Sequence, residues 1–288
     1  MDYVKPAEVL ENMIASGQSK AELSHSQLIV RGALAGAILA CATTLAYTAA
    51  AQTHVPLAGA IIFPVGFIMI ILLGLELVTG SFALIPLALL ERRATTARMI
   101  HNFVWVILGH LLGCGVYAAL YGLTLTKMGT DMSSPLIQTI ISASETKTNA
   151  YRQLGAAGMG LVIIKAVLCN WLVTLGVVMA MTSKSTLGKI AAMSLPVITF
   201  FAQGFEHAVV NMFVIPAGIL LGASVTWGDW WLWNQVPVLI GNFIGGALFT
   251  GILFYVSQRG FARKGRTAEA GGLHVRELNL EVVPEEQR

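Results

Sequence analysis

Residues 74–86 read GLELVTGSFALIP and residues 204–216 read GFEHAVVNMFVIP, so the same pattern recurs 130 positions apart. Each stretch begins with Gly-x-Glu and ends with Ile-Pro, and each follows an apolar run that already contains a proline, Pro64 or Pro196. Glycine, proline and glutamate thus interrupt two segments that are otherwise apolar enough to cross a membrane. Paired interruptions of this kind are typical of transporters built from two repeats, whose broken helices lie near the midplane.

The composition places these stretches in an integral membrane protein. Of the 288 residues, 56% are hydrophobic and 11% are charged, whereas an ordinary soluble domain carries about 25% charged residues. Apolar runs long enough for a hydrocarbon core of about 30 Å predict six spans, at residues 28–51, 57–91, 99–126, 156–182, 189–222 and 235–257. The expected fold class is all-α, with the second and fifth spans leaving helical geometry over residues 75–83 and 204–211.

Two further matches indicate that the chain is duplicated. Residues 31–36 resemble 165–170, and residues 109–113 resemble 241–245. Because each half holds three spans, the second half lies upside down in the membrane, which makes an inverted repeat. The predicted organisation is an interfacial amphipathic helix in 1–27, a six-span transmembrane domain in 28–258 with halves at about 28–126 and 156–258, and a tail in 259–288.

The orientation follows from lysine and arginine, which are in excess in cytoplasmic loops. Most of them fall on the side of the membrane that holds both termini. The opposite side has only Lys127, Lys147 and Arg152. We therefore expect a multi-pass protein of the cytoplasmic membrane with both termini in the cytoplasm.

His207 is the leading candidate for a functional residue, because an ionisable side chain inside a membrane is costly and by default functional. It lies in the second break, beside Glu206. With an unperturbed pKa of about 6.5, histidine can accept or release a proton at physiological pH. The alternative is a neutral ring that only forms a hydrogen bond between helices.

Glu76 and Glu206 occupy equivalent positions in the two breaks. We expect them to be structural, with each carboxylate accepting hydrogen bonds from backbone N–H groups that a broken helix leaves without partners. Cation ligation is the alternative, but no second carboxylate accompanies either residue. Asn211 is expected to hold the second break together or to form a hydrogen bond with His207.

Three other polar residues are expected along a substrate pathway. Thr79 lies where the first break turns, and its hydroxyl could face an anion or His207, or could cap the following helix. Lys165 lies roughly 13 Å into the fourth span, where its charge would concentrate anions at the bottom of an external vestibule. Lys20 would act in the same way on the inner side, or would be an ordinary interfacial lysine.

Apolar side chains flank both breaks. Aromatic residues in a span usually pack against their neighbours, but beside loops that line a cavity some would form constrictions that reject bare ions and pass neutral molecules. The predicted constriction residues are Phe63, Phe67, Leu77 and Phe200.

Four motifs carry a resemblance to a known family: ELVTG at 76–80, CNWLV at 169–173, GFEHxxxNM at 204–212 and IGNxIGG at 240–246. Over roughly residues 5–258 the chain resembles the formate/nitrite transporter family, and within it the formate channels. The resemblance implies an aquaporin-like bundle of six spans, although neither break has the Asn-Pro-Ala motif of aquaporins. It also implies a homopentamer with one pore per protomer, which passes monovalent anions of weak acids.

Residue by residue, the resemblance implies that His207 is the pore histidine and that Thr79 is the hydroxyl facing it. It assigns the four predicted constriction residues to the same role, and it makes Asn170 and Asn242 polar pore or structural positions. Val78 stands where some relatives have an aromatic residue, which leaves the width of the constriction open.

These features predict a passive or proton-coupled channel in the lipid bilayer for a small monocarboxylate. Formate is the first candidate, with nitrite, lactate or hydrosulfide as alternatives, and His207 would supply a proton or a hydrogen bond to the passing anion. Rival classes are a channel for neutral solutes and an intramembrane enzyme using Glu206 and His207. The sequence shows no metal-ligand cluster, phosphate loop or activated nucleophile, so we expect no enzymatic activity, metal, cofactor or nucleic-acid partner.

Overall fold

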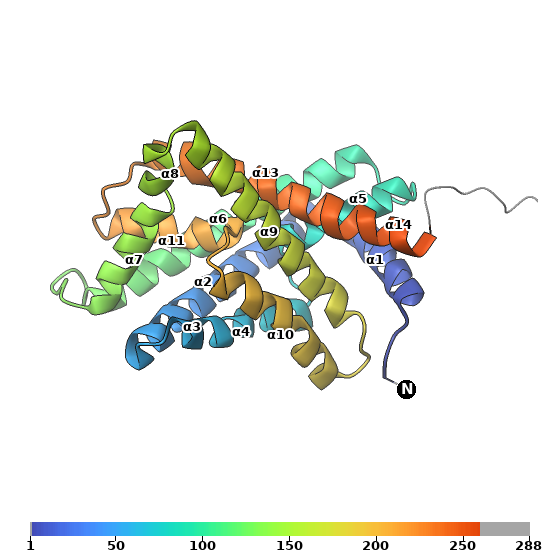
Figure 1. The fold of residues 1–288 in the computed structure, drawn as a ribbon, viewed down its shortest axis with the longest axis horizontal. Coiled ribbons are helices and arrows are strands. Elements are labelled where there is room, and N and C mark those ends of the chain that lie inside the picture. The colour runs from blue at the N-terminus through green and yellow to red at the C-terminus, as the bar shows by residue number, and fades with distance from the viewer. Residues whose placement is uncertain (1, 260–288) are drawn as a thin grey trace, which may run out of the picture.

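The computed structural model describes residues 2–259 and shows a bundle of helices (Figure 1). Four helical runs are long and apolar enough to cross a membrane: α2 (His25–Thr53), α6 (Thr96–Leu125), α9 (Ala156–Ala180) and the final run Trp227–Arg259. That final run consists of α12 (Trp227–Trp230), a π-helical turn (Trp231–Gln235), α13 (Val236–Ile244), a second π-helical turn (Gly245–Ile252) and α14 (Leu253–Arg259). The predicted all-α membrane fold is confirmed.

The second and fifth spans are broken, as predicted. The second consists of α3 (Pro56–Ile62), α4 (Pro64–Leu72) and α5 (Val78–Leu90), and the fifth consists of α10 (Thr186–Ala202) and α11 (Ala208–Leu220). The non-helical segments, 73–77 and 203–207, are shorter than the sequence indicated. Residues 78–83 and 208–211 are helical, because side chains from other helices cap the new helix at its first residue.

The two breaks differ at their prolines. Pro64 is the first residue of α4, directly after Phe63, and it separates α3 from α4. Pro196 lies inside the continuous helix α10. A proline at the first position of a helix removes an N–H that has no intrahelical partner in any case. The first repeat therefore has an additional bend that the second repeat lacks.

Each repeat opens with a short helix that packs against the second half of its broken span. In the first repeat α1 (Pro6–Ala21) contacts α5, and in the second α7 (Pro135–Thr146), followed by α8 (Asn149–Gln153), contacts α11. Figure 1 shows these two packed pairs at opposite ends of the molecule. The sequence predicts a helix ahead of the first span, where α1 lies, but no counterpart in the position of α7.

Glycines let the long helices of each repeat approach closely. A Cβ atom on Gly109 would lie 2.6 Å from the carbonyl oxygen of Ile29, and one on Gly241 would lie 2.7 Å from that of Ile163. These positions join α6 to α2 and α13 to α9. These glycines therefore pack within the protomer, where they bring backbones together as is common in membranes.

Both ends of the described chain are held against the bundle. The Asp2 carboxylate accepts hydrogen bonds from the Ser183 hydroxyl and from the backbone N–H groups of Lys184 and Ser185. At the other end, Arg259 of α14 forms ion pairs with Glu11 of α1 and with Glu91. Of the predicted tail 259–288, only Arg259, the last residue of α14, is among the described residues.

Candidate transport pathway

The two breaks have the same backbone geometry. Gly74 and Gly204 have φ values of 63° and 62°, a left-handed conformation that glycine adopts without steric cost. Leu77 and His207 are extended, and each precedes the first residue of a new helix. The glycines in the repeated Gly-x-Glu motif therefore end one half-helix so that the next can begin four residues later.

His207 lies at the meeting point of the two repeats. Its Nδ1 accepts a hydrogen bond from the backbone N–H of Val210 at 3.3 Å, and its Nε2 lies 3.2 Å from the Thr79 hydroxyl. Because Nδ1 is the acceptor, the neutral ring carries its proton on Nε2 and donates it to Thr79. The structure thus brings together the two residues that the sequence analysis placed opposite each other.

An apolar environment surrounds this pair. His207 is 2% exposed, and its ring stacks on Phe200 with centroids 5.6 Å apart. Phe63 meets Phe200 edge-on at 5.7 Å. All four predicted constriction residues are buried, namely Phe63, Phe67, Leu77 and Phe200.

The glutamates of the two breaks bind lysines. Glu76 Oε1 lies 2.8 Å from Lys20 Nζ, and Glu206 Oε2 lies 2.9 Å from Lys147 Nζ. Both carboxylates are 2% exposed, so each buried charge is compensated by a salt bridge. The sequence analysis expected backbone N–H donors instead. Each break is therefore joined electrostatically to the short helix that opens its own repeat.

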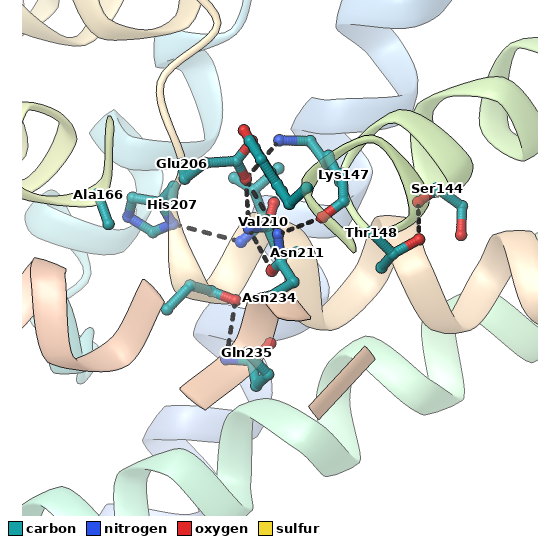
Figure 2. A network of polar contacts seen from close by, with 12 residues as sticks. Ser144, Lys147, Thr148, Ala166, Glu206, His207, Val210, Asn211, Asn234 and Gln235 are labelled. Carbon is teal, nitrogen blue, oxygen red and sulfur yellow. Dashed lines mark hydrogen bonds and ion pairs between the residues drawn. The ribbon is translucent and has the colours of Figure 1, made fainter. Parts of the chain in front are cut away.

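Glu206 is the centre of a larger polar network in the second break (Figure 2). Besides Lys147, it accepts hydrogen bonds from the Tyr151 hydroxyl at 2.7 Å and from Asn211 Nδ2 at 2.7 Å. Asn211 Nδ2 also donates to Asn234 Oδ1 at 2.8 Å. Asn211 thus holds the break through Glu206. Of the two roles considered for it, a hydrogen bond to His207 is made only by the backbone, from Asn211 N to the His207 carbonyl oxygen at 3.0 Å, while the described side-chain contacts of Asn211 are to Glu206 and Asn234.

The backbone N–H groups freed at the breaks are bound by side chains from the third and sixth spans. His110 Nε2 accepts from Val78 N at 3.1 Å, and Asn242 Oδ1 accepts from Ala208 N at 2.9 Å. His110 and Asn242 occupy equivalent positions in the GHLLG and GNFIG stretches. They perform the capping that the sequence analysis had assigned to the glutamates, since an unpaired N–H is costly in a membrane.

Asn170 and Asn242 are bound to backbone oxygens. Asn170 Nδ2 donates to the carbonyl oxygens of Thr79 and Asn242, at 3.1 and 2.6 Å. Asn242 Nδ2 donates to those of Ala166 and Glu206, at 2.8 and 2.9 Å. Both amides therefore join the two breaks to the fourth and sixth spans. Their contacts favour the structural role over the pore role.

A cavity opens on each side of the central pair. The α1 vestibule is a cavity of about 400 Å³ whose lining includes Lys20 and Glu76. The α7 vestibule is a cavity of about 690 Å³ whose lining includes Lys147, Lys165 and Glu206. Lys165 thus lies in a vestibule, as expected. His207 belongs to neither lining and is separated from both.

Sequence reasoning missed three residues of the second break, Lys147, Tyr151 and Asn234. The sequence predicts Lys147 only as one of three basic residues on the external side. One signal was present: Lys20 precedes Glu76 by 56 positions and Lys147 precedes Glu206 by 59, so the repeat extends to the lysines. Tyr151 and Asn234 have no such signal, because their side chains meet Glu206 only through the tertiary fold.

The chain has relatives along nearly its whole length. It matches the family model for formate/nitrite transporters over residues 7–256. An uncharacterised transporter of Bacillus subtilis, YrhG, is 34% identical over 263 residues, which cover 89% of this chain and 94% of that protein. The formate channel BtFdhC of Bacillus thuringiensis is 30% identical, over 88% of this chain and 96% of that protein.

Solved structures share the fold. An ion channel of the same family superimposes with a TM-score of 0.74 at 24% identity, and covers 86% of this chain and 98% of that one. A pentameric formate channel with formate bound gives a TM-score of 0.66 at 22% identity, over 81% and 97% of the two chains. The family match, together with four helical runs that are long and apolar enough to cross a membrane, leads to one conclusion: the chain is a multi-pass membrane protein that belongs to the formate/nitrite transporter family.

Proposed function

We propose that the protein is a channel for small monovalent anions of weak acids, with formate as the principal substrate. The observation that carries this proposal is the buried His207–Thr79 pair, 3.2 Å apart, between two cavities that each contain a lysine. Two of the relatives, in Methanothermobacter thermautotrophicus and Bacillus thuringiensis, are named as a probable formate transporter and a formate channel. These names favour formate over nitrite.

In the proposed mechanism the vestibule lysines attract the anion, and the apolar section between the vestibules rejects it as a bare charge. Moving an unscreened charge through such a section is costly. The Nε2–H of His207, which Thr79 accepts at rest, is the donor within reach of an anion arriving at the break. Water on the side from which the anion comes first protonates Nδ1, which gives up its hydrogen bond from Val210, and the ring becomes an imidazolium. The imidazolium passes its Nε2 proton to the anion, which crosses as the neutral acid and leaves the ring neutral, so one anion and one proton cross together.

Glu76, Glu206 and Asn211 are structural in this proposal. The two carboxylates hold Lys20 and Lys147 at the inner ends of the vestibules, and Asn211 fixes Glu206. Neither glutamate faces an ion pair partner other than its lysine among the described residues. The protein acts as a transporter and not as an enzyme.

The proposal extends to assembly and placement. Residues 28–258 form the channel domain, residues 1–27 an interfacial segment, and residues 259–288 a cytoplasmic tail. We place α1 and both termini at the cytoplasmic face of the cytoplasmic membrane, because that face receives most of the lysines and arginines. The pentameric assembly named for the solved formate channel is proposed for this chain as well.

Uptake into proteoliposomes tests the function. The purified protein is reconstituted, and the initial rates for formate, nitrite, lactate and hydrosulfide are compared at two external pH values. We expect formate uptake that rises as the external pH falls and that the other weak acids inhibit. Uptake of glycerol or urea with no anion transport would instead identify a channel for neutral solutes.

A further inference from the structure

The two vestibules differ in the cations that remain after the salt bridges are counted. In the α1 vestibule the Lys20–Glu76 pair leaves Arg31 and Lys189 in the lining. In the α7 vestibule the Lys147–Glu206 pair leaves Lys165 alone. Within residues 2–259 none of these three cations forms a salt bridge. The lining of the α1 vestibule therefore carries an excess of two positive charges, and that of the α7 vestibule an excess of one.

The difference arises from one helix of the repeat. Arg31 and Lys165 occupy equivalent positions in the matched stretches 31–36 and 165–170. Each vestibule therefore receives one of these two positive charges, and they do not account for the difference. Lys189 is in the first turns of α10 and is half-buried. Its place in the first repeat is taken by α3, whose sequence PLAGAII has no basic residue. Lys189 is thus a charge that the inverted repeat supplies to one side only.

We propose that Arg31 and Lys189 make the α1 vestibule the stronger attractor of the two, so that transport from the cytoplasmic face saturates at a lower anion concentration than transport from the outside. This inference rests on the proposed function. One unit charge about 7 Å from a monovalent anion in water-filled space raises the local anion concentration roughly threefold. The two faces should therefore differ roughly threefold in half-saturation.

Thermodynamics limits the form of this asymmetry. A passive pathway with equal pH on both sides and no membrane potential must have the same ratio of maximal rate to half-saturation constant in both directions. Vestibule charges lie on one side of the central barrier. They do not change the free energy of the transported species at the barrier relative to the bulk solution. They therefore lower the half-saturation constant and the maximal rate together on their own side, and they leave the other side unaffected.

The test uses transport from each face separately. Right-side-out and inside-out vesicles are prepared from a host without formate transporters, and initial rates are measured with labelled formate at equal pH. Arg31→Gln and Lys189→Gln should each raise the cytoplasmic half-saturation constant roughly threefold and leave the external constant unchanged. Lys165→Gln should do the reverse. Arg31→Lys should retain the wild-type value.

Lys184→Gln is the matched control, because Lys184 is an exposed lysine five positions before Lys189 that lines neither vestibule. It should change neither constant. The shifts should disappear in about 1 M of an impermeant salt, where the Debye length falls to about 3 Å. Equal constants on both faces of the wild type, a shift on both faces, or a shift that persists in high salt would each overturn the inference. If the wild type itself transports no formate, it is the proposed function that fails.

Discussion

At the scale of single residues, the pathway depends on one imidazole ring. His207→Phe should nearly abolish uptake of the weak acid. It also leaves the Thr79 hydroxyl and the Val210 N–H without their partner, at about 1–3 kcal/mol for each buried group, so uptake is compared per amount of folded protein. His207→Asn retains a side chain that can cap α11 but removes the titratable group. It should conduct poorly, or pass anions without the wild-type dependence on pH. Both variants are measured by formate uptake at two external pH values.

The opposite result is informative. If His207→Asn kept wild-type formate uptake with the same pH dependence, the ring would be a structural hydrogen-bond donor. The proton step would then have to involve Lys165, Lys20 or water in the vestibules.

The salt bridge of the second break gives a second prediction at this scale. Lys147→Met leaves the Glu206 carboxylate buried without its cation, which should cost about 3–5 kcal/mol of stability. Lys147→Met combined with Glu206→Gln removes both charges and should cost less than the single change. The midpoint of thermal unfolding in detergent measures both. A double variant less stable than the single one would show that Glu206 does not depend on Lys147.

At the scale of elements, the capping residues His110 and Asn242 are expected to be partly exchangeable. His110→Asn should retain stability, because an amide offers an acceptor for Val78 N and a donor for the Gly32 carbonyl oxygen, to which the ring donates from Nδ1 in the wild type. Asn242→Leu leaves Ala208 N and two carbonyl oxygens without partners, at about 1–3 kcal/mol for each buried group. Thermal unfolding distinguishes the variants, with Asn12→Leu on the exposed surface of α1 as the control. An equal loss of thermal stability in His110→Asn and Asn242→Leu would mean that the shape of the side chain, rather than its hydrogen bonding, matters at these positions.

The attachment of the N-terminal segment should depend on pH. The hydrogen bond from the Ser183 hydroxyl, together with those from the N–H groups of Ser185 and Lys184, lowers the pKa of Asp2 below its usual value. A carboxyl with a lowered pKa stabilises the folded state above its unfolded pKa of about 3.9, and this contribution is lost as the pH falls through the lower folded value. The protection factor of residues 2–5 against hydrogen exchange, which is the intrinsic rate at each pH divided by the observed rate, should therefore be constant near neutrality and fall in acid. Asp2→Asn should have a low protection factor already at pH 7.

The breaks themselves were predictable from local sequence, because glycine, proline and glutamate are unfavourable inside an apolar membrane helix and so indicate that the helix is interrupted there. Their length was overestimated, since the prediction had no means of knowing that His110 and Asn242 cap the next helix at its first residue. The partners of Glu206 were missed for the same reason. Tyr151 and Asn234 look like ordinary polar residues until the fold brings them to within hydrogen-bonding distance of a buried carboxylate.

At the scale of the whole molecule, the described chain is expected to form a pentamer. Its outer surface carries many exposed apolar side chains on α2 and α6, for example Leu34, Leu112 and Leu120, which lipid or neighbouring protomers must cover. Native mass spectrometry in mild detergent should show five copies with lipid retained. Detection of monomers or dimers alone would contradict the pentamer. It would not contradict the proposed transport pathway, which lies within each protomer.

The contact between His207 and Thr79 also has a consequence for how such a molecule can arise. In the repeat, His207 corresponds to Leu77 and Thr79 corresponds to Val209. A dimer of two identical halves would present every residue twice, so a histidine near its axis would face its own copy, and two imidazolium rings would repel each other. Joining the halves in one polypeptide lets a single gene encode a donor on one side of the axis and an acceptor on the other. A single proton site at the axis therefore requires two halves of different sequence, which one fused polypeptide provides and a dimer of identical halves cannot.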